Sequence, residues 1–148
     1  MGKRRKGREI VLQSMYASLI SGAPLLDVLD DQIQRRESAP ESATFARDLA
    51  GKVKLHSGDI DRWLRTLVTG SWDPDRLGSL EMVILSMGLA ELRYSPDVPH
   101  AVVINEALEL AHRYCEDGSV GFVNGVLDKA ASQVTAAAPA ADKDEGTP

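Results

Sequence analysis

Residues 97–131 read DVPHAVVINEALELAHRYCEDGSVGFVNGVLDKAA and contain two helical patterns separated by a turn. Pro99 suits the first turn of a helix, where its missing N–H is not needed, and it disfavours a helical conformation in the residue before it. Apolar residues then recur at helical spacing until Asp117 and Gly118 interrupt the pattern. Ser119 follows, a residue type that often caps a helix N-terminus. The stretch therefore predicts two consecutive helices, each with one buried face.

Two glycines stand out within the second of these helices. Gly121 and Gly125 are one turn apart, and each costs about 1 kcal/mol relative to alanine in a helix interior. Asn124, a poor helix former, lies between them. We expect something to approach the backbone closely here, and the sequence leaves two alternatives open: a neighbouring helix or a bound ligand.

The segments VPHAVVINEALELAHRY and SVGFVNGVLDKAA closely resemble the signature of the NusB family of transcription antitermination factors. The resemblance extends to DPDRLGSLEMVILSMGLAELRYSPDVP and to the opening KRRKGREIVLQSMYA, and so spans about residues 4–134. It implies an all-α, NusB-like fold of about seven helices in two packed small bundles. We expect one domain over residues 1–134, with bundles at about 4–56 and 57–134.

The composition agrees with a helical class, because aromatic residues make up only 5% of the chain and strand-like alternation is absent. Asp73 and Pro74 are expected to cap a helix whose residues 80–92 are apolar almost all round, and such a helix is buried by several neighbours. The tail, residues 135–148, has no large apolar residue and is expected to be disordered.

The first eight residues hold five of the 17 Lys and Arg residues and none of the 22 acids. A helix N-terminus already carries partial positive charge, so cations there oppose helix stability and favour the binding of an anion. The alternative is a disordered, solubilising arm. With the resemblance, we predict an RNA surface whose candidate residues are Lys3, Arg4, Arg5, Lys6, Arg8, Tyr16, Phe122 and Asn124.

Each candidate has an expected role. The arginines would meet RNA phosphates with the lysines adding charge, Tyr16 and Phe122 would stack on bases, and Asn124 would read a base edge. The resemblance implies that the arginine-rich opening and the FVNG region belong to the RNA surface, although Gly121 stands where many relatives have Lys or Arg. Phe122 as a buried core residue is the competing interpretation. Alanine at all three arginines is expected to leave the fold intact.

The resemblance also implies partners: boxA-type RNA bound together with ribosomal protein NusE, within an elongation complex of RNA polymerase and other Nus factors. Glu81 is expected to be an exposed acid for a basic partner protein, with an ordinary solvated glutamate as the alternative. The sequence leaves the oligomeric state open, a homodimer included.

Catalytic patterns are missing from the sequence. His56, His100 and His112 lack the spacing of metal ligands, and no GxGxxG or Walker A pattern occurs, so we expect no metal, no cofactor and no active site. No membrane span is expected, and a single cysteine, Cys115, fits a reducing cytoplasm. Two other functions stay open: a helical protein-interaction or dimerisation module, and a stand-alone relative of the RNA-binding module of ribosomal RNA cytosine methyltransferases.

Overall fold

The computed structural model describes residues 2–68 and 78–145, and within them every regular element is a helix. The helices are α1 (Lys3–Ser21), α2 (Leu25–Arg35), α3 (Pro40–Leu55), α4 (Ser57–Leu67), α5 (Ser79–Tyr94), α6 (His100–Tyr114) and α7 (Asp117–Glu145). The all-α class and the helical hairpin of α6 and α7 are therefore confirmed. Asp73 and Pro74, predicted as a helix cap, lie outside the described residues.

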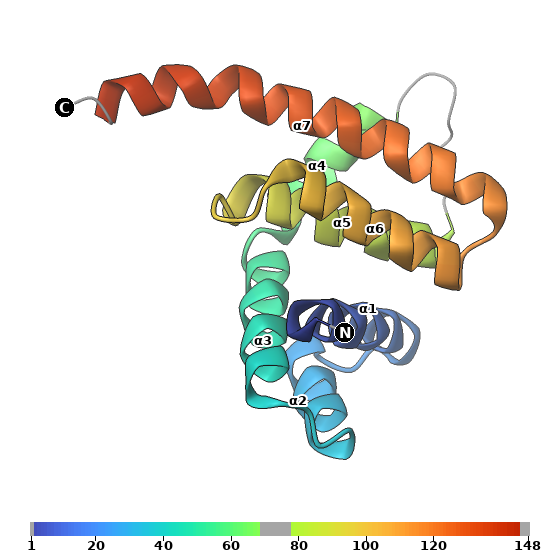
Figure 1. Cartoon of the computed structure of the whole chain (residues 1–148). Coiled ribbons are helices and arrows are strands. Elements are labelled where there is room, and N and C mark those ends of the chain that lie inside the picture. Colours follow the sequence, from blue (N-terminus) through green and yellow to red (C-terminus); the bar gives the residue numbers. More distant parts are fainter. Residues whose placement is uncertain (1, 69–77, 146–148) are drawn as a thin grey trace.

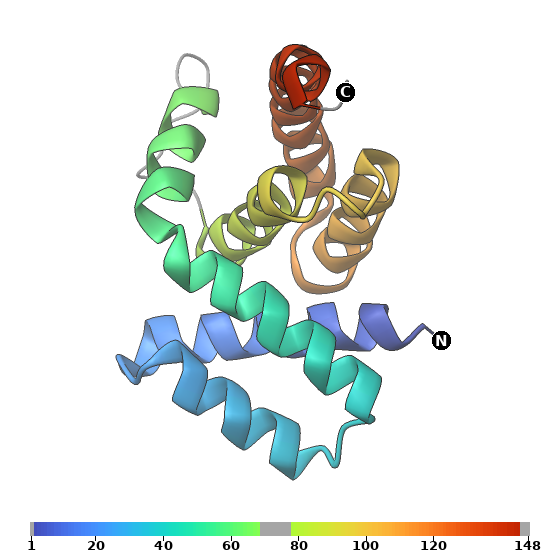
Figure 2. The ribbon, with the colours of Figure 1, turned by 90° about the vertical axis from the view of Figure 1, so that its left-hand side faces the viewer.

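Helices α1, α2 and α3 gather on one side of the molecule, and α4, α5, α6 and α7 gather on the other (Figures 1 and 2). Helix α1 packs on α2 and α3 and also reaches α5, so it lies at the junction. The limits predicted for two bundles, 4–56 and 57–134, stay a prediction. What the packing establishes is that the basic start of α1 is held against the second group of helices.

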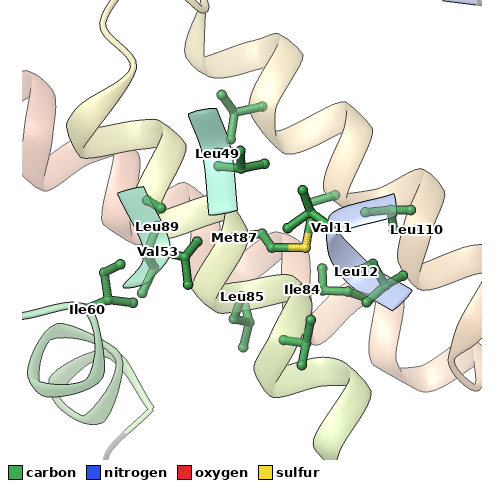
Figure 3. Packing of buried hydrophobic residues seen from close by; sticks show 14 of the residues in the cluster. Val11, Leu12, Leu49, Val53, Ile60, Ile84, Leu85, Met87, Leu89 and Leu110 are labelled. Atoms are coloured by element: carbon green, nitrogen blue, oxygen red, sulfur yellow. The ribbon is translucent and has the colours of Figure 1, made fainter. Parts of the chain in front are cut away.

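Helix α5 is the centre of the fold, as its apolar sequence predicted. It packs on α1, α3, α4, α6 and α7, and nearly every residue from Val83 to Leu92 is buried. Figure 3 shows Val11 and Leu12 of α1 meeting Ile84 and Met87 of α5 in this core. One hydrophobic cluster runs through both groups of helices.

The helix ends follow local chemistry. Gly22 ends α1 in the left-handed conformation, with φ 79°, and its N–H donates to the carbonyl of Ser18 at 2.8 Å. Pro40 is the first residue of α3, where its missing N–H costs nothing. His56 separates α3 from α4 and stacks on the ring of Tyr94, with 3.6 Å between ring centroids.

Helix α7 is described through Glu145. The disorder predicted for residues 135–148 stays a prediction.

The helix-packing interpretation of Gly121 and Gly125 is wrong. A Cβ atom built on either glycine would have no other group within 4 Å, and both residues are exposed. The close approaches occur at other glycines. A Cβ at Gly7 would lie 2.8 Å from Cδ2 of Phe45, and one at Gly88 would lie 2.9 Å from a methyl group of Leu127.

Two glycine-to-alanine changes should therefore shift stability in opposite directions. Gly125→Ala is expected to stabilise the protein by up to about 1 kcal/mol, because alanine is the better helix former and has open space there. Gly7→Ala is expected to destabilise it by about 1–3 kcal/mol, because the new methyl group also meets the backbone oxygen of Ser42 at 3.0 Å. Urea unfolding of both variants measures the change in the free energy of unfolding. A change of the same sign in both variants would contradict this account of the glycines.

Candidate nucleic-acid interface

Arg8 does not lie on an exposed arm. It is 4% exposed, and its Nε and Nη2 atoms each donate a hydrogen bond of 2.8 Å to the carboxylate of Glu91, which is 3% exposed. Its guanidinium also lies over the ring of Phe45, 4.8 Å from the centroid. The prediction of Arg8 as a solvent-facing phosphate contact is wrong because α1 begins at Lys3, which puts Arg8 on its second turn and toward α5.

Arg5 is also held by an acid of the fold. Its Nε and Nη2 atoms donate to the two carboxylate oxygens of Glu106 at 3.0 and 2.8 Å. The hydrogen bonds from Arg5 lower the pKa of Glu106, against the opposing effect of burial. A lowered pKa means that this pair stabilises the fold above the ordinary glutamate pKa and that the contribution is lost as the pH falls through the lowered value.

The other three cations of the basic segment (residues 3–8) remain exposed to solvent. Arg4 is 58% exposed, 3.9 Å from Asp97, and Lys6 is 61% exposed, 3.8 Å from Glu9. Lys3 is exposed, and among the described residues it makes no ion pair. Exposed pairs at these distances contribute little, so these cations can turn to an incoming anion at small cost.

The aromatic and amide candidates are not in the same place as the basic segment. Tyr16 is exposed on α1, two turns beyond Arg8 and about 12 Å further along the helix axis. Phe122 and Asn124 are half-buried on α7, which packs mainly on α4, α5 and α6. Phe122 packs against the core, in agreement with its competing interpretation. A single ligand would have to extend along the surface to meet all of these groups.

Glu81 is not the exposed acid that was expected. It is half-buried, and its Oε2 accepts a hydrogen bond of 2.5 Å from the hydroxyl of Ser119, which joins the start of α5 to the start of α7. Burial, followed by the negative charge of Glu81, raises the pKa of Cys115 to about 11. That thiol is therefore protonated and unreactive at neutral pH.

A polar network that was not predicted from the sequence lies beside the basic segment. Glu9 accepts a hydrogen bond from Arg113 and another, at 3.2 Å, from the hydroxyl of Tyr114. Gln13 donates a hydrogen bond to the same hydroxyl at 2.8 Å and accepts one from Arg36, the residue that follows α2. The signal was present in the sequence, since Glu9 and Gln13 are one turn apart and interrupt the apolar pattern of α1.

No group of three or more His, Cys, Asp or Glu side chains among the described residues is placed to hold a metal ion. No helix among those residues is both long and apolar enough to cross a lipid bilayer.

Comparison with known proteins gives consistent matches. The model of the NusB family matches residues 5–132. Proteins named transcription antitermination protein NusB are 36% identical over 135 residues in Myxococcus xanthus, covering 88% of this chain and 96% of the relative, and 38% identical over 138 residues in Geobacter sulfurreducens, covering 89% and 96%.

Solved structures agree with the fold. A structure of T. maritima NusB superposes with a TM-score of 0.80 at 27% identity, covering 87% of this chain and 90% of the other. A crystal structure of the antitermination factors NusB and NusE in complex with double-stranded RNA superposes with a TM-score of 0.81 at 22% identity, covering 90% and 98%.

Proposed function

This chain belongs to the NusB family of transcription antitermination proteins, and we propose that it binds boxA-type single-stranded RNA together with ribosomal protein NusE to support transcription of ribosomal RNA. The family is one of non-enzymatic factors, and the proposed action requires binding alone. It would take place in the cytoplasm, on an elongation complex that contains RNA polymerase and other Nus factors.

The observation that carries the RNA proposal is the exposed positive charge at the start of α1. Lys3, Arg4 and Lys6 face solvent there, and the N-terminus of α1 adds partial positive charge in the same place. The chain after residue 8 holds 12 Lys and Arg residues against 22 acids, a formal net charge of −10. A polyanion is therefore attracted to these three exposed cations and repelled by the net charge of the rest of the chain.

The candidate residues differ in solvent exposure, and their proposed roles differ accordingly. Lys3, Arg4 and Lys6 would make the phosphate contacts, whereas Arg8 and Arg5 would mainly hold α1 in place through Glu91 and Glu106. Tyr16 is exposed enough to stack on a base, which is a common mode of single-strand recognition.

The partner proposal is supported by the solved complex of NusB and NusE with double-stranded RNA, whose NusB has the same fold as this chain. The methyltransferase-module alternative is less well supported, because this chain covers 96% of two relatives that are named antitermination proteins. A protein-interaction module without RNA binding is the remaining alternative, and titration with RNA separates it from the proposal.

We expect a boxA-like RNA to bind roughly tenfold or more tightly than a scrambled RNA of equal length, since one good base-edge contact discriminates by about 1–3 kcal/mol. Fluorescence titration of both labelled RNAs at one salt concentration measures the ratio. Phosphate contacts are the same for both RNAs and cancel in that ratio. Equal affinities would contradict sequence-selective RNA binding by this chain.

A further inference from the structure

One acid lies on the side of α1 that leads from the basic segment toward Tyr16. Glu9, Gln13 and Tyr16 follow one another at spacings of four and three residues, so they share one side of the helix. The side chain of Glu9 is 14% exposed. A polyanion that contacts both the basic segment and Tyr16 passes this carboxylate, whose negative charge opposes it.

Cations from two other parts of the chain converge on Glu9. Arg36 follows the last residue of α2, and its Nη1 atom lies 3.8 Å from Oε1 of Glu9. Arg113 is in the last turn of α6, and its Nη1 atom donates a hydrogen bond to Oε2 of Glu9. The C-terminal end of a helix carries partial negative charge, which favours a cation at both positions. We call Glu9, Arg36 and Arg113 the Glu9 cluster.

The cations of the Glu9 cluster are more accessible than the acid that they surround. Arg113 is 52% exposed and Arg36 is 29% exposed. Arg36 lines a cavity of about 570 Å³ between the start of α1 and the connection from α2 to α3, and Arg113 lines a hollow between α1 and α6. Two guanidinium groups around one carboxylate leave a net positive charge, so an anion can reach both arginines and is attracted to them.

The contacts within the Glu9 cluster differ from those of the two arginines that hold α1 in place. Arg8 and Arg5 each place two nitrogen atoms on the two oxygens of one acid, which is the strong geometry for such a pair. Arg113 reaches Glu9 with one nitrogen atom, and Arg36 lies beyond hydrogen-bond distance. Partly exposed contacts of this kind contribute little to stability, so an incoming anion can replace them at small cost.

Neutral groups also hold the carboxylate of Glu9. The hydroxyl of Tyr114 donates to Oε2 of Glu9 at 3.2 Å, and the side chain of Gln13 donates to that hydroxyl at 2.8 Å. These two hydrogen bonds do not involve an arginine. Glu9 therefore keeps its position on α1 when Arg36 or Arg113 turns to another anion.

We propose that Glu9 is an internal competitor of RNA, because its carboxylate holds Arg36 and Arg113 and a phosphate group of bound RNA must take them from it. This inference rests on the proposed function and adds to it a residue that limits RNA affinity. The exchange replaces two contacts with Glu9 by two contacts with phosphate. The net gain from these arginines is then smaller than two unpaired arginines would give.

The first test compares Glu9→Gln with Glu109→Gln. Glutamine at position 9 loses the charge and can still accept the hydrogen bond from Tyr114. Two released cations should raise the salt slope by up to about 1.4 and tighten binding by up to roughly 25-fold at about 0.1 M salt. Glu109 is an exposed acid one turn before Arg113, and in the described part of the chain it accepts no hydrogen bond from an arginine. Its variant should keep the wild-type slope.

The second test removes the two arginines. In an Arg36→Gln/Arg113→Gln background, Glu9 no longer holds either guanidinium group, so adding Glu9→Gln should raise RNA affinity only about as much as Glu109→Gln does. An equal gain from Glu9→Gln in both backgrounds would show that the lost charge alone is the cause and would overturn the proposal. A gain no larger than that of Glu109→Gln in the native background would overturn it as well.

NMR of the arginine Nε–H groups follows the exchange without relying on affinity. Adding RNA to wild type should shift the signals of Arg36 and Arg113. In Glu9→Gln without RNA, the same signals should already differ from those of wild type, because their acceptor is gone. Signals of both arginines that stay unshifted when RNA binds to wild type would contradict the exchange.

The proposed function and the competitor can fail separately. Released arginines contact phosphates, so the gain from Glu9→Gln should be the same for boxA-like and scrambled RNA. A wild type that prefers boxA-like RNA, with no gain from Glu9→Gln, overturns the competitor and leaves the function. A wild type without preference, whose Glu9→Gln variant binds both RNAs more tightly, overturns the function and leaves the competitor.

Discussion

Arg8→Ala is expected to destabilise the protein by about 3–5 kcal/mol, the usual cost of removing one partner from a buried ion pair. The variant leaves the carboxylate of Glu91 buried at 3% exposure without the two hydrogen bonds that it now accepts. It also removes the contact between the guanidinium and the ring of Phe45, so α1 loses a connection to both α3 and α5. A loss of this size is a large part of the stability of a domain.

Urea unfolding measures this loss against two controls. Arg4→Ala removes the same charge from an exposed position, and we expect it to change stability by no more than about 0.5 kcal/mol. The double variant Arg8→Met/Glu91→Leu removes both buried charges together and should recover most of the lost stability. An Arg8→Ala variant as stable as Arg4→Ala would contradict the buried pair.

This expectation also reverses a sequence-based one. The sequence predicts that a triple variant with alanine at Arg4, Arg5 and Arg8 keeps its fold and loses most of its affinity for RNA. The structure shows that such a triple variant removes one exposed charge, that of Arg4, and two charges that hold α1 in place, those of Arg5 and Arg8. Loss of RNA binding in it would not identify a phosphate contact, whereas the exposed lysines can be replaced without disturbing a buried partner.

Local features were predictable from the sequence. Pro99 marked the start of α6, and the all-round apolar sequence of α5 indicated its central place. These predictions succeeded because a proline or a run of apolar residues determines the conformation of the few residues next to it. The prediction of Ser119 as the cap of the last helix was wrong, because α7 begins at Asp117 and the hydroxyl of Ser119 donates to Glu81 instead.

Long-range contacts were not predictable in the same way. Arg8 and Glu91 are 83 residues apart, and nothing in either local sequence identifies the other as its partner. The glycines show the same limit. Sequence reveals that Gly7 and Gly125 both lie in helices, but only the packing shows that Phe45 crowds one and open space surrounds the other.

The binding of RNA is expected to be strengthened about 5–150-fold by saturating NusE, which corresponds to a coupling free energy of about 1–3 kcal/mol. The chain after residue 8 has 12 Lys and Arg residues against 22 acids, a formal net charge of −10, so it repels a polyanion and the short basic segment must supply nearly all of the attraction. Many relatives have Lys or Arg where this chain has Gly121. If that cation contacts RNA in the relatives, this chain lacks one further contact. A basic partner docked on the acidic body would offset part of the repulsion.

Thermodynamic reciprocity makes this coupling testable in two directions. RNA affinity with and without saturating NusE must change by the same factor as NusE affinity with and without RNA. Glu81→Gln serves as a control for the docking surface, because the hydrogen bond from Ser119 engages this side chain and the neutral amide oxygen can keep that bond. If Glu81 instead supplied a charge to the partner, this variant would lower NusE affinity while leaving the fold intact. Equal affinities in both pairs of titrations would show that the two ligands bind independently, and charge neutralisation by the partner would then not be the basis of RNA binding.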